Sequence, residues 1–240
     1  MKTILLRVTT IIALVEFSIM LVFESFSFEM GMYAIAVLDV FLLVITSTPM
    51  IYFWIIKPYA VERDAAMQQV SHMAYHDTLT QLANRRLLTE HLNKLISMNV
   101  RVKSHSAILF IDLDGFKRIN DEYGHDVGDS VLIEVAKRLS ALARNEDIVS
   151  RLGGDEFVIL LSQVGTDQLL ANKNSLVFAQ RVLKEISKDI NFKDSTHQIG
   201  ASIGLRLLLP EVICAVTSLK DADIAMYRAK RAGKGQIVFH

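Results

Sequence analysis

Residues 148–161 read IVSRLGGDEFVILL, and this stretch decides the fold. Ile148–Leu152 and Phe157–Leu161 are apolar runs of strand length, separated by a segment with two glycines. Glycine supplies the positive φ angles of tight turns, so the pattern predicts a β-hairpin. The turn also carries Asp155 and Glu156. These carboxylates lie beside bare backbone, where an anionic substrate could bind with a metal ion.

A second carboxylate motif follows another predicted strand. Ala107–Ile111 reads AILFI, a continuous apolar run typical of a strand buried on both faces. The run leads into Asp112 and Asp114, and Mg²⁺ prefers such oxygen ligands. Acidic strand ends are common, so this motif alone is a weak indication. Together the two motifs favour one metal site, with Lys117 placed to neutralise phosphate charge.

The rest of this region alternates between helical and strand-like patterns. Apolar residues at helical spacing predict helices, whereas short apolar runs predict strands. The predicted helices are 85–98, 126–143, 169–186 and 221–232, and two further strands are predicted at 198–207 and 236–239. Interleaved elements of this kind indicate an α/β or α+β domain with a central sheet flanked by helices.

Residues 124–129 read GHDVGD and precede a long predicted helix. Asp126 is predicted as the N-cap and Asp129 as a first-turn charge, and both would stabilise the helix N-terminus. The alternative is base recognition, because guanine offers N1–H and N2–H₂ side by side to a carboxylate. Asn120 would then bind the remaining edge of the base.

These motifs closely resemble the GGDEF-domain diguanylate cyclases, from about His76 to the C-terminus. The motif that gives the family its name stands intact at 153–157. Around it lie, in the family's order, 77–85 (DTLTQLANR), 112–121 (DLDGFKRIND), 124–129 and 222–230 (ADIAMYRAK). Gln81 departs from a glycine that is common at its position, which puts nothing catalytic in doubt.

The resemblance implies a ferredoxin-like core, related to adenylyl cyclases and polymerase palms, with a mostly antiparallel sheet. It implies condensation of two GTP into cyclic di-GMP and two pyrophosphates, with two Mg²⁺ ions, or Mn²⁺, in each active site. The matching metal ligands are Asp112, the main-chain carbonyl of Leu113, and Asp155, with Glu156 beside them. Asp155 also matches the group proposed to take the 3′-hydroxyl proton.

The resemblance also assigns the substrate contacts. Asn120 and Asp129 match the guanine contacts. Lys117, Lys230 and Lys234 match phosphate contacts, although the family often has arginine at the last position. Phe116, Gly153 and Gly154 complete the implied substrate-binding set.

Dimerisation and feedback are implied in the same way. Each domain of the family holds one GTP, so two copies must face each other in a homodimer. Arg144 and Asp147 match the family's RxxD inhibitory site for cyclic di-GMP, in register with Gly153. By composition alone, residues 144–147 would be an ordinary exposed turn.

The first 56 residues hold two candidate membrane spans. The run 32–56 is long enough to cross a bilayer, whereas 8–23 reaches that length only with the leucines before it. A cleaved signal peptide is the alternative for the first run, but Glu16 interrupts it and no clear cleavage site follows. Basic residues at the outer ends place both ends in the cytoplasm, which predicts a multi-pass protein of the bacterial inner membrane with lipid as a partner. Glu16 and Asp39 are expected to face a partner helix or an interface.

The sequence therefore predicts three parts. Residues 1–56 form a membrane hairpin, 57–75 a helical connector, and 76–240 the catalytic domain. Val61, Ala65, Val70 and Met73 lie at helical spacing in the connector. This spacing suits either a short coiled coil between two copies or a single helix docked on the domain.

Composition narrows the function classes. Lys+Arg 26 balances Asp+Glu 26 among 240 residues, so no basic excess points to nucleic acid. Cys214 is the one cysteine, which excludes an internal disulfide, and we expect it to be a small buried hydrophobe. Two alternatives stay open: an idle domain that acts as a receptor for GTP or cyclic di-GMP, and a membrane scaffold. The intact acidic residues of both motifs argue against them.

Overall fold

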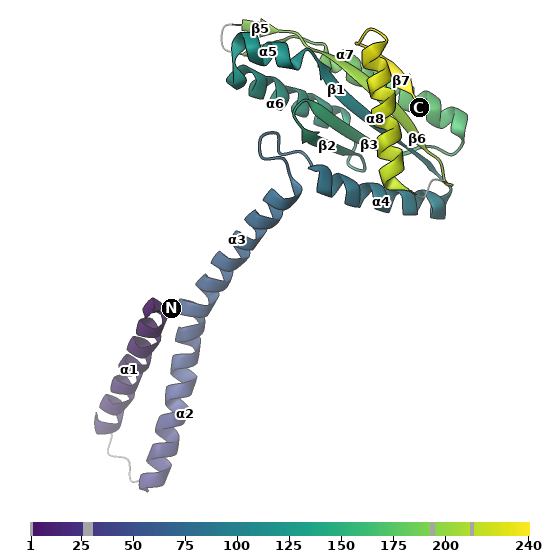
Figure 1. Ribbon diagram of the computed structural model, residues 1–240. Coiled ribbons are helices and arrows are strands. Elements are labelled where there is room, and N and C mark those ends of the chain that lie inside the picture. The colour runs from purple at the N-terminus through teal and green to yellow at the C-terminus, as the bar shows by residue number, and fades with distance from the viewer. Residues whose placement is uncertain (1, 26–30, 193–194, 212–213) are drawn as a thin grey trace. The chain divides into compact units, whose positions relative to one another are not determined.

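The chain folds into two compact units, residues 1–71 and 72–240. The computed structural model describes the backbone of residues 2–25, 31–192, 195–211 and 214–240, and their side chains except those of 2–3, 64–66 and 68–72 (Figure 1). The helices are α1 (Lys2–Ser25), α2 (Met32–Ile51), the π-helical η1 (Tyr52–Ile56), α3 (Lys57–Tyr75), α4 (Arg85–Val102), α5 (Phe116–Tyr123), α6 (His125–Leu142), α7 (Gln168–Ile186) and α8 (Ala215–Arg231). The strands are β1 (His105–Asp114), β2 (Ile148–Gly153), β3 (Glu156–Gly165), β4 (Ile190–Phe192), β5 (Ser195–His197), β6 (Gly200–Leu208) and β7 (Ile237–Phe239).

The second unit is built on a sheet with β1 at its centre. The strand order is β2-β3-β1-β6-β7, and a separate small hairpin joins β4 to β5. Every pairing in the large sheet is antiparallel except β6 with β7. The prediction of a mostly antiparallel central sheet flanked by helices is confirmed.

Helices cover both faces of this sheet. Leu109 and Ile111 of β1 pack with α6 and α7, whereas Ile108 and Phe110 pack with α4 and α8. Successive side chains of a strand point to opposite faces, so a strand covered on both sides must be apolar throughout. This explains the uninterrupted apolar run of β1, which leads into the buried Asp112 at the C-terminal end of the strand.

Three elements differ from the sequence-based expectation. The short helix α5 and the β4–β5 hairpin were not predicted, because these elements are shorter than the stretch of sequence over which periodicity is counted. Helix α8 begins at Ala215, well before the predicted start at residue 221. Its N-cap is Cys214, which makes no side-chain capping hydrogen bond to the backbone, so the usual start signal is missing. Cys214 itself is exposed, and its expected burial is wrong.

The first unit contains a hairpin of two apolar helices. Ile11, Val15 and Ile19 of α1 are buried against Leu42 and Leu43 of α2. Two helical segments, Ile4–Ser25 and Met32–Arg63, are long and apolar enough to cross a membrane. In the most apolar 18-residue stretch of each segment, only 17% of the first and 6% of the second is buried. A core helix of a soluble protein would be mostly buried.

Helix α2 continues into α3 through η1. Pro49 lies inside α2, and proline cannot donate a hydrogen bond to the preceding turn. The π-helical turn η1 begins at Tyr52, three residues after Pro49. There Tyr52 N donates to the carbonyl oxygens of Thr48 and Pro49. The residues predicted to form the connector are helical as α3. Coiled-coil pairing stays a prediction, and the side chains of Ala65 and Val70 lie outside the described set.

Gly204 provides a test of how α8 sits on the sheet. A Cβ added at Gly204 would lie 2.1 Å from the carbonyl oxygen of Ala222 and 2.2 Å from the Met226 nitrogen, both backbone atoms of α8. Gly204→Ala should therefore lower the free energy of unfolding by about 3 kcal/mol, the upper end of overpacking effects. Thermal or denaturant unfolding measures this. Gly200→Ala is the control, since its new Cβ would lie 3.4 Å from the nearest atom; equal losses for both variants would contradict the predicted close contact.

Candidate active site

The strands bring the two carboxylate motifs together. Asp112 lies opposite Glu156 in the antiparallel β1–β3 register. Next to this pair, Leu113 N donates a 3.2 Å hydrogen bond to the Asp155 carbonyl oxygen. The acidic end of β1 and the tip of the β2–β3 hairpin therefore form one site, as the sequence motifs suggested.

The hairpin turn depends on two glycines and one arginine. Gly153 and Gly154 have φ angles of 145° and 53°, which favour glycine. Arg151 donates from Nε and Nη2 to the Gly154 carbonyl oxygen at 3.0 and 2.8 Å. Its Nη1 donates to Asp77 Oδ1 at 2.9 Å, so the turn is fastened to the segment before α4.

Asp77 is a positioning group that the sequence analysis did not single out. Its carboxylate also accepts hydrogen bonds from the Thr80 amide and hydroxyl at 2.8 and 2.6 Å. Burial alone would raise the pKa of Asp77, but hydrogen bonds from Thr80 and Arg151 outweigh burial and hold the pKa below its usual range. The Asp77–Arg151 pair therefore stays charged and keeps the turn in place.

Asp112 is the most strongly perturbed acid in the site. It is only 5% exposed, and Lys230 Nζ lies 2.5 Å from its Oδ1. Burial raises the pKa of Asp112 to about 6, and the negative charges of Asp155 and Glu156 add to this against the opposing effect of Lys230. Burial also raises the pKa of Glu156, and the nearby negative charge of Asp223 raises it further. The carboxylates of this site therefore carry more negative charge than the ammonium of Lys230 compensates.

This arrangement fits a hard divalent cation. Asp112 Oδ1 is buried and its charge is only partly offset by its ion pair with Lys230, so a cation could bind this oxygen in addition to the ammonium or in its place. Among the described residues, no three His, Cys, Asp or Glu side chains converge as a complete metal site. Mg²⁺ commonly takes only one or two carboxylates and fills its shell with phosphates and water. Asp112, Asp155 and a main-chain carbonyl would meet that need once a nucleotide is bound.

The predicted guanine contacts lie on adjacent helices. Asn120 of α5 packs against α6, where a Cβ on Gly128 would lie 1.9 Å from Asn120 Oδ1. Glycine at 128 thus leaves room for the amide beside exposed Asp129. Gly124, not Asp126, is the N-cap of α6, and Asp126 is the first-turn acid. Asp129 lies beyond the first turn, so stabilisation of the helix N-terminus does not explain an aspartate at this position.

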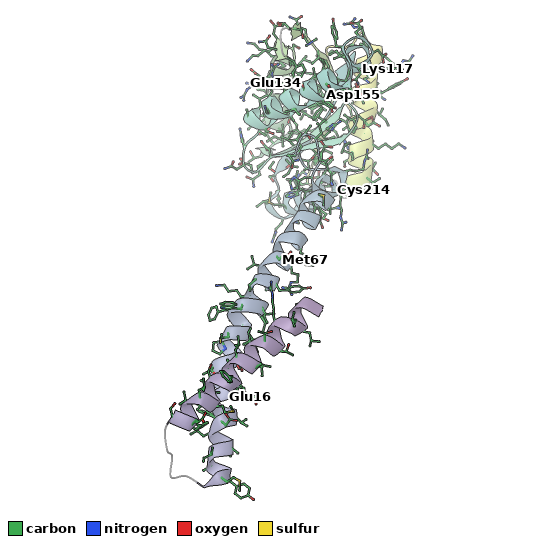
Figure 2. The ribbon with its side chains drawn as sticks, turned by 90° about the vertical axis from the view of Figure 1, so that its left-hand side faces the viewer. Glu16, Met67, Lys117, Glu134, Asp155 and Cys214 are labelled. Carbon is green, nitrogen blue, oxygen red and sulfur yellow. The ribbon has the colours of Figure 1, made fainter. Side chains whose placement is uncertain are left out.

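The predicted phosphate contacts flank the same strand end. Gly115, at a φ of 82°, turns the chain from β1 into α5, whose first residues are buried Phe116 and exposed Lys117. Lys117 and Asp155 are labelled in the same region of the domain in Figure 2. Lys230 approaches from the last turn of α8, and Lys234 follows in the loop to β7.

The predicted inhibitory residues lie in the loop between α6 and β2. Asp147 is buried, and its two oxygens accept from the amides of Arg144 at 2.9 Å and Ser162 at 3.0 Å. The Arg144 side chain is 69% exposed and lies 3.9 Å from Glu146. Asp147 therefore anchors the loop in this conformation, whereas Arg144 faces solvent.

Comparison with known proteins shows the family of this chain. The family described as "Diguanylate cyclase, GGDEF domain" matches residues 74–236. The chain belongs to the GGDEF family. The bifunctional diguanylate cyclase/cyclic di-GMP phosphodiesterase MucR of Pseudomonas aeruginosa is 38% identical over 174 residues, 72% of this chain and 24% of MucR. Diguanylate cyclase TpbB of P. aeruginosa is 37% identical over 167 residues, 69% of this chain and 37% of TpbB. The chain thus spans a minor part of the length of these relatives.

Solved GGDEF structures are similar in fold. A structure comprising only the GGDEF domain of P. aeruginosa TpbB has a TM-score of 0.64 and 36% identity, covering 69% of this chain and 94% of that one. The coiled coil and GGDEF domain of Caulobacter crescentus DgcB, in complex with c-di-GMP, gives a TM-score of 0.68 at 24% identity, covering 77% and 95%. At that identity DgcB supports the fold alone.

Asp112→Asn should change the pH dependence of stability. Because the pKa of Asp112 is raised to about 6 from 3.8, the carboxyl stabilises the fold below pH 4, and this contribution is lost as pH rises through 6. Without divalent cations, Asp112→Asn should be more stable than wild type by about 3 kcal/mol above pH 7, shrinking toward zero near pH 4. Denaturant unfolding at several pH values measures the difference. Glu90→Gln, which removes an exposed carboxylate, is the control; a pH-independent gain for Asp112→Asn would contradict the assignment.

Proposed function

We propose that this protein is a diguanylate cyclase that condenses two GTP into cyclic di-GMP and two pyrophosphates. The observation that carries the proposal is the buried, incompletely compensated carboxylate of Asp112, in register with Glu156 and beside Asp155. A receptor would have little need for such a charge, whereas metal-assisted phosphoryl transfer requires it. The names of relatives such as TpbB support the same reading.

In this proposal the acidic residues at the end of β1 and in the hairpin turn bind the metal ions and accept the proton. Asp112, the Leu113 carbonyl and Asp155 would hold Mg²⁺ or Mn²⁺, two ions per site, with Glu156 beside them. When bound, the cation supplies Lewis-acid stabilisation of charge on the α-phosphate and the pyrophosphate. Asp155 holds the proton that leaves the 3′-hydroxyl.

The substrate contacts complete the proposed site. Asn120 and Asp129 orient the guanine, while Lys117, Lys230 and Lys234 neutralise the phosphates. Gly153 and Gly154 of the hairpin leave the backbone open to the nucleotide, and Phe116 is the remaining residue of the proposed substrate-binding set. Because Gly128 has no side chain, it leaves the space that the Asn120 amide occupies beside the proposed base site.

The proposed active form is a homodimer. One domain offers one carboxylate cluster, and condensation needs two GTP held face to face. In this proposal residues 76–240 are the catalytic domain, and the helical segment 57–75 sets the approach of two copies.

We also propose a multi-pass location in the bacterial inner membrane. The two N-terminal helices expose most of their apolar side chains, as lipid contact requires. Exposed Arg7 lies near the start of the first apolar segment, and Lys57 and Arg63 lie near the end of the second. This distribution puts both ends and the catalytic domain in the cytoplasm. Glu16, labelled on the N-terminal helices in Figure 2, is exposed on α1. Asp39 of α2 is half-buried.

Turnover by variants tests the reaction. Asp155→Asn should reduce cyclic di-GMP formation by about a hundredfold or more, because a cation ligand and the proton acceptor are both lost. Product is measured by chromatography after incubation of the full-length protein with GTP and Mg²⁺. Glu90→Gln should retain wild-type turnover. Unchanged product formation by Asp155→Asn contradicts the catalytic assignment, and GTP binding without any turnover by wild type would favour the receptor alternative.

A second proposal is product inhibition through Arg144. Its exposed guanidinium can fork onto a phosphate or guanine edge of cyclic di-GMP, while Asp147 holds the loop. Arg144→Ala should keep the initial rate but lose the slowdown as product accumulates, because the site lies apart from Asp112. Progress curves with added cyclic di-GMP measure this. Equal product sensitivity in wild type and Arg144→Ala would show that 144–147 is a plain turn.

A further inference from the structure

Asp114 uses its carboxylate differently from Asp112, although both lie at the end of β1. Oδ1 accepts a 2.8 Å hydrogen bond from Ser202 Oγ of β6. Oδ2 accepts a 2.9 Å hydrogen bond from the backbone amide of Gly235, which is 121 residues away in sequence. Both oxygens of Asp114 therefore accept hydrogen bonds from other elements of the domain, whereas Asp112 is paired with the ammonium of Lys230.

The loop that Asp114 holds has an unusual backbone. Gly233, Lys234 and Gly235 have φ angles of 124°, 65° and 59°, three successive residues in the region that favours glycine. Lys234 has a side chain there, and such a conformation persists only when surrounding contacts fix it. Lys234 N donates to the Ala229 carbonyl oxygen at 3.2 Å, which fixes one end of the loop to α8. The Asp114 hydrogen bond fixes the other end to β1.

This loop joins the parts of the site that carry positive charge. Lys230, in the last turn of α8, lies 2.5 Å from Asp112, and Lys234 follows it in the loop. Beyond the loop, Ile203 N donates to the Gln236 carbonyl oxygen at 2.9 Å, which leads the chain into β7. Without the hydrogen bond from Gly235 to Asp114, fewer hydrogen bonds would hold the backbone around Lys234.

We propose that Asp114 is a positioning residue that holds the 233–235 loop so that Lys234 faces the nucleotide phosphates. The proposal rests on the cyclase function proposed above. It assigns Asp114 neither to the cation nor to the base, and it explains why a second aspartate lies so close to Asp112 without sharing its ligand.

A double-mutant cycle on the full-length protein tests the kinetic part. Asp114→Ala and Lys234→Ala should each raise the KM for GTP by about tenfold, and Asp114→Ala should add nothing further to Lys234→Ala. Asp114→Asn should keep most of the activity, because its amide oxygen can still accept from Gly235. A metal ligand would behave otherwise: multiplicative losses in the double variant, or a loss in Asp114→Asn equal to that in Asp114→Ala, would overturn the proposal.

Hydrogen exchange tests the tether independently of turnover. The amide of Gly235 should exchange at least about tenfold faster in Asp114→Ala than in wild type, because its acceptor is gone. Ser202→Ala is the matched control, since it removes the other partner of the carboxylate and leaves the Gly235 bond. Unchanged exchange in Asp114→Ala would refute the tether whatever the kinetics show. If wild type produced no cyclic di-GMP but this exchange changed as expected, the proposed function would fail and the tether would stand.

Discussion

Asp112 is a carboxylate that folding removes from water at the end of the central strand. Such burial costs several kcal/mol unless the charge is well compensated, and here Lys230 compensates it only in part. The surrounding structure maintains this condition. Strand register places Glu156 opposite, and Gly204 allows α8 to approach closely enough for its last turn to present Lys230. The domain thus holds a negative charge that is not fully compensated, and under the proposed function a divalent cation bound with the nucleotide would offset it.

The central part of the fold could be predicted because its signals are local. A continuous apolar run marks β1, and two apolar runs around paired glycines mark the β2–β3 hairpin. Strand β1 ends in acids and the turn into β3 carries acids, so the two motifs together were enough to predict one site. The start of α8 was missed because Cys214 gives no capping signal. Helix α5 was missed because its eight residues are fewer than the stretch over which helical periodicity is counted.

The supporting contacts of the site could not be predicted from local pattern. Arg151 meets Asp77 across 74 residues, and Asp114 meets Gly235 across 121. Each residue type is ordinary where it stands, and only folding brings the partners together. Gln81 is similar: its φ of 61° explains why glycine is common at this place in the family, while its side chain donates to the Thr78 carbonyl oxygen.

The π-helical turn at Tyr52–Ile56 also has a geometric meaning. A regular α-helix advances by about 100° per residue, and a π turn accommodates one residue more than an α turn. Every side chain of the first unit beyond η1 is therefore offset around the helix axis by about that angle, compared with an uninterrupted helix from α2 to α3. Conversion between π and α geometry in these five residues would turn the following helix about its own axis. A change of helix type in this segment would therefore change which face the following helix presents.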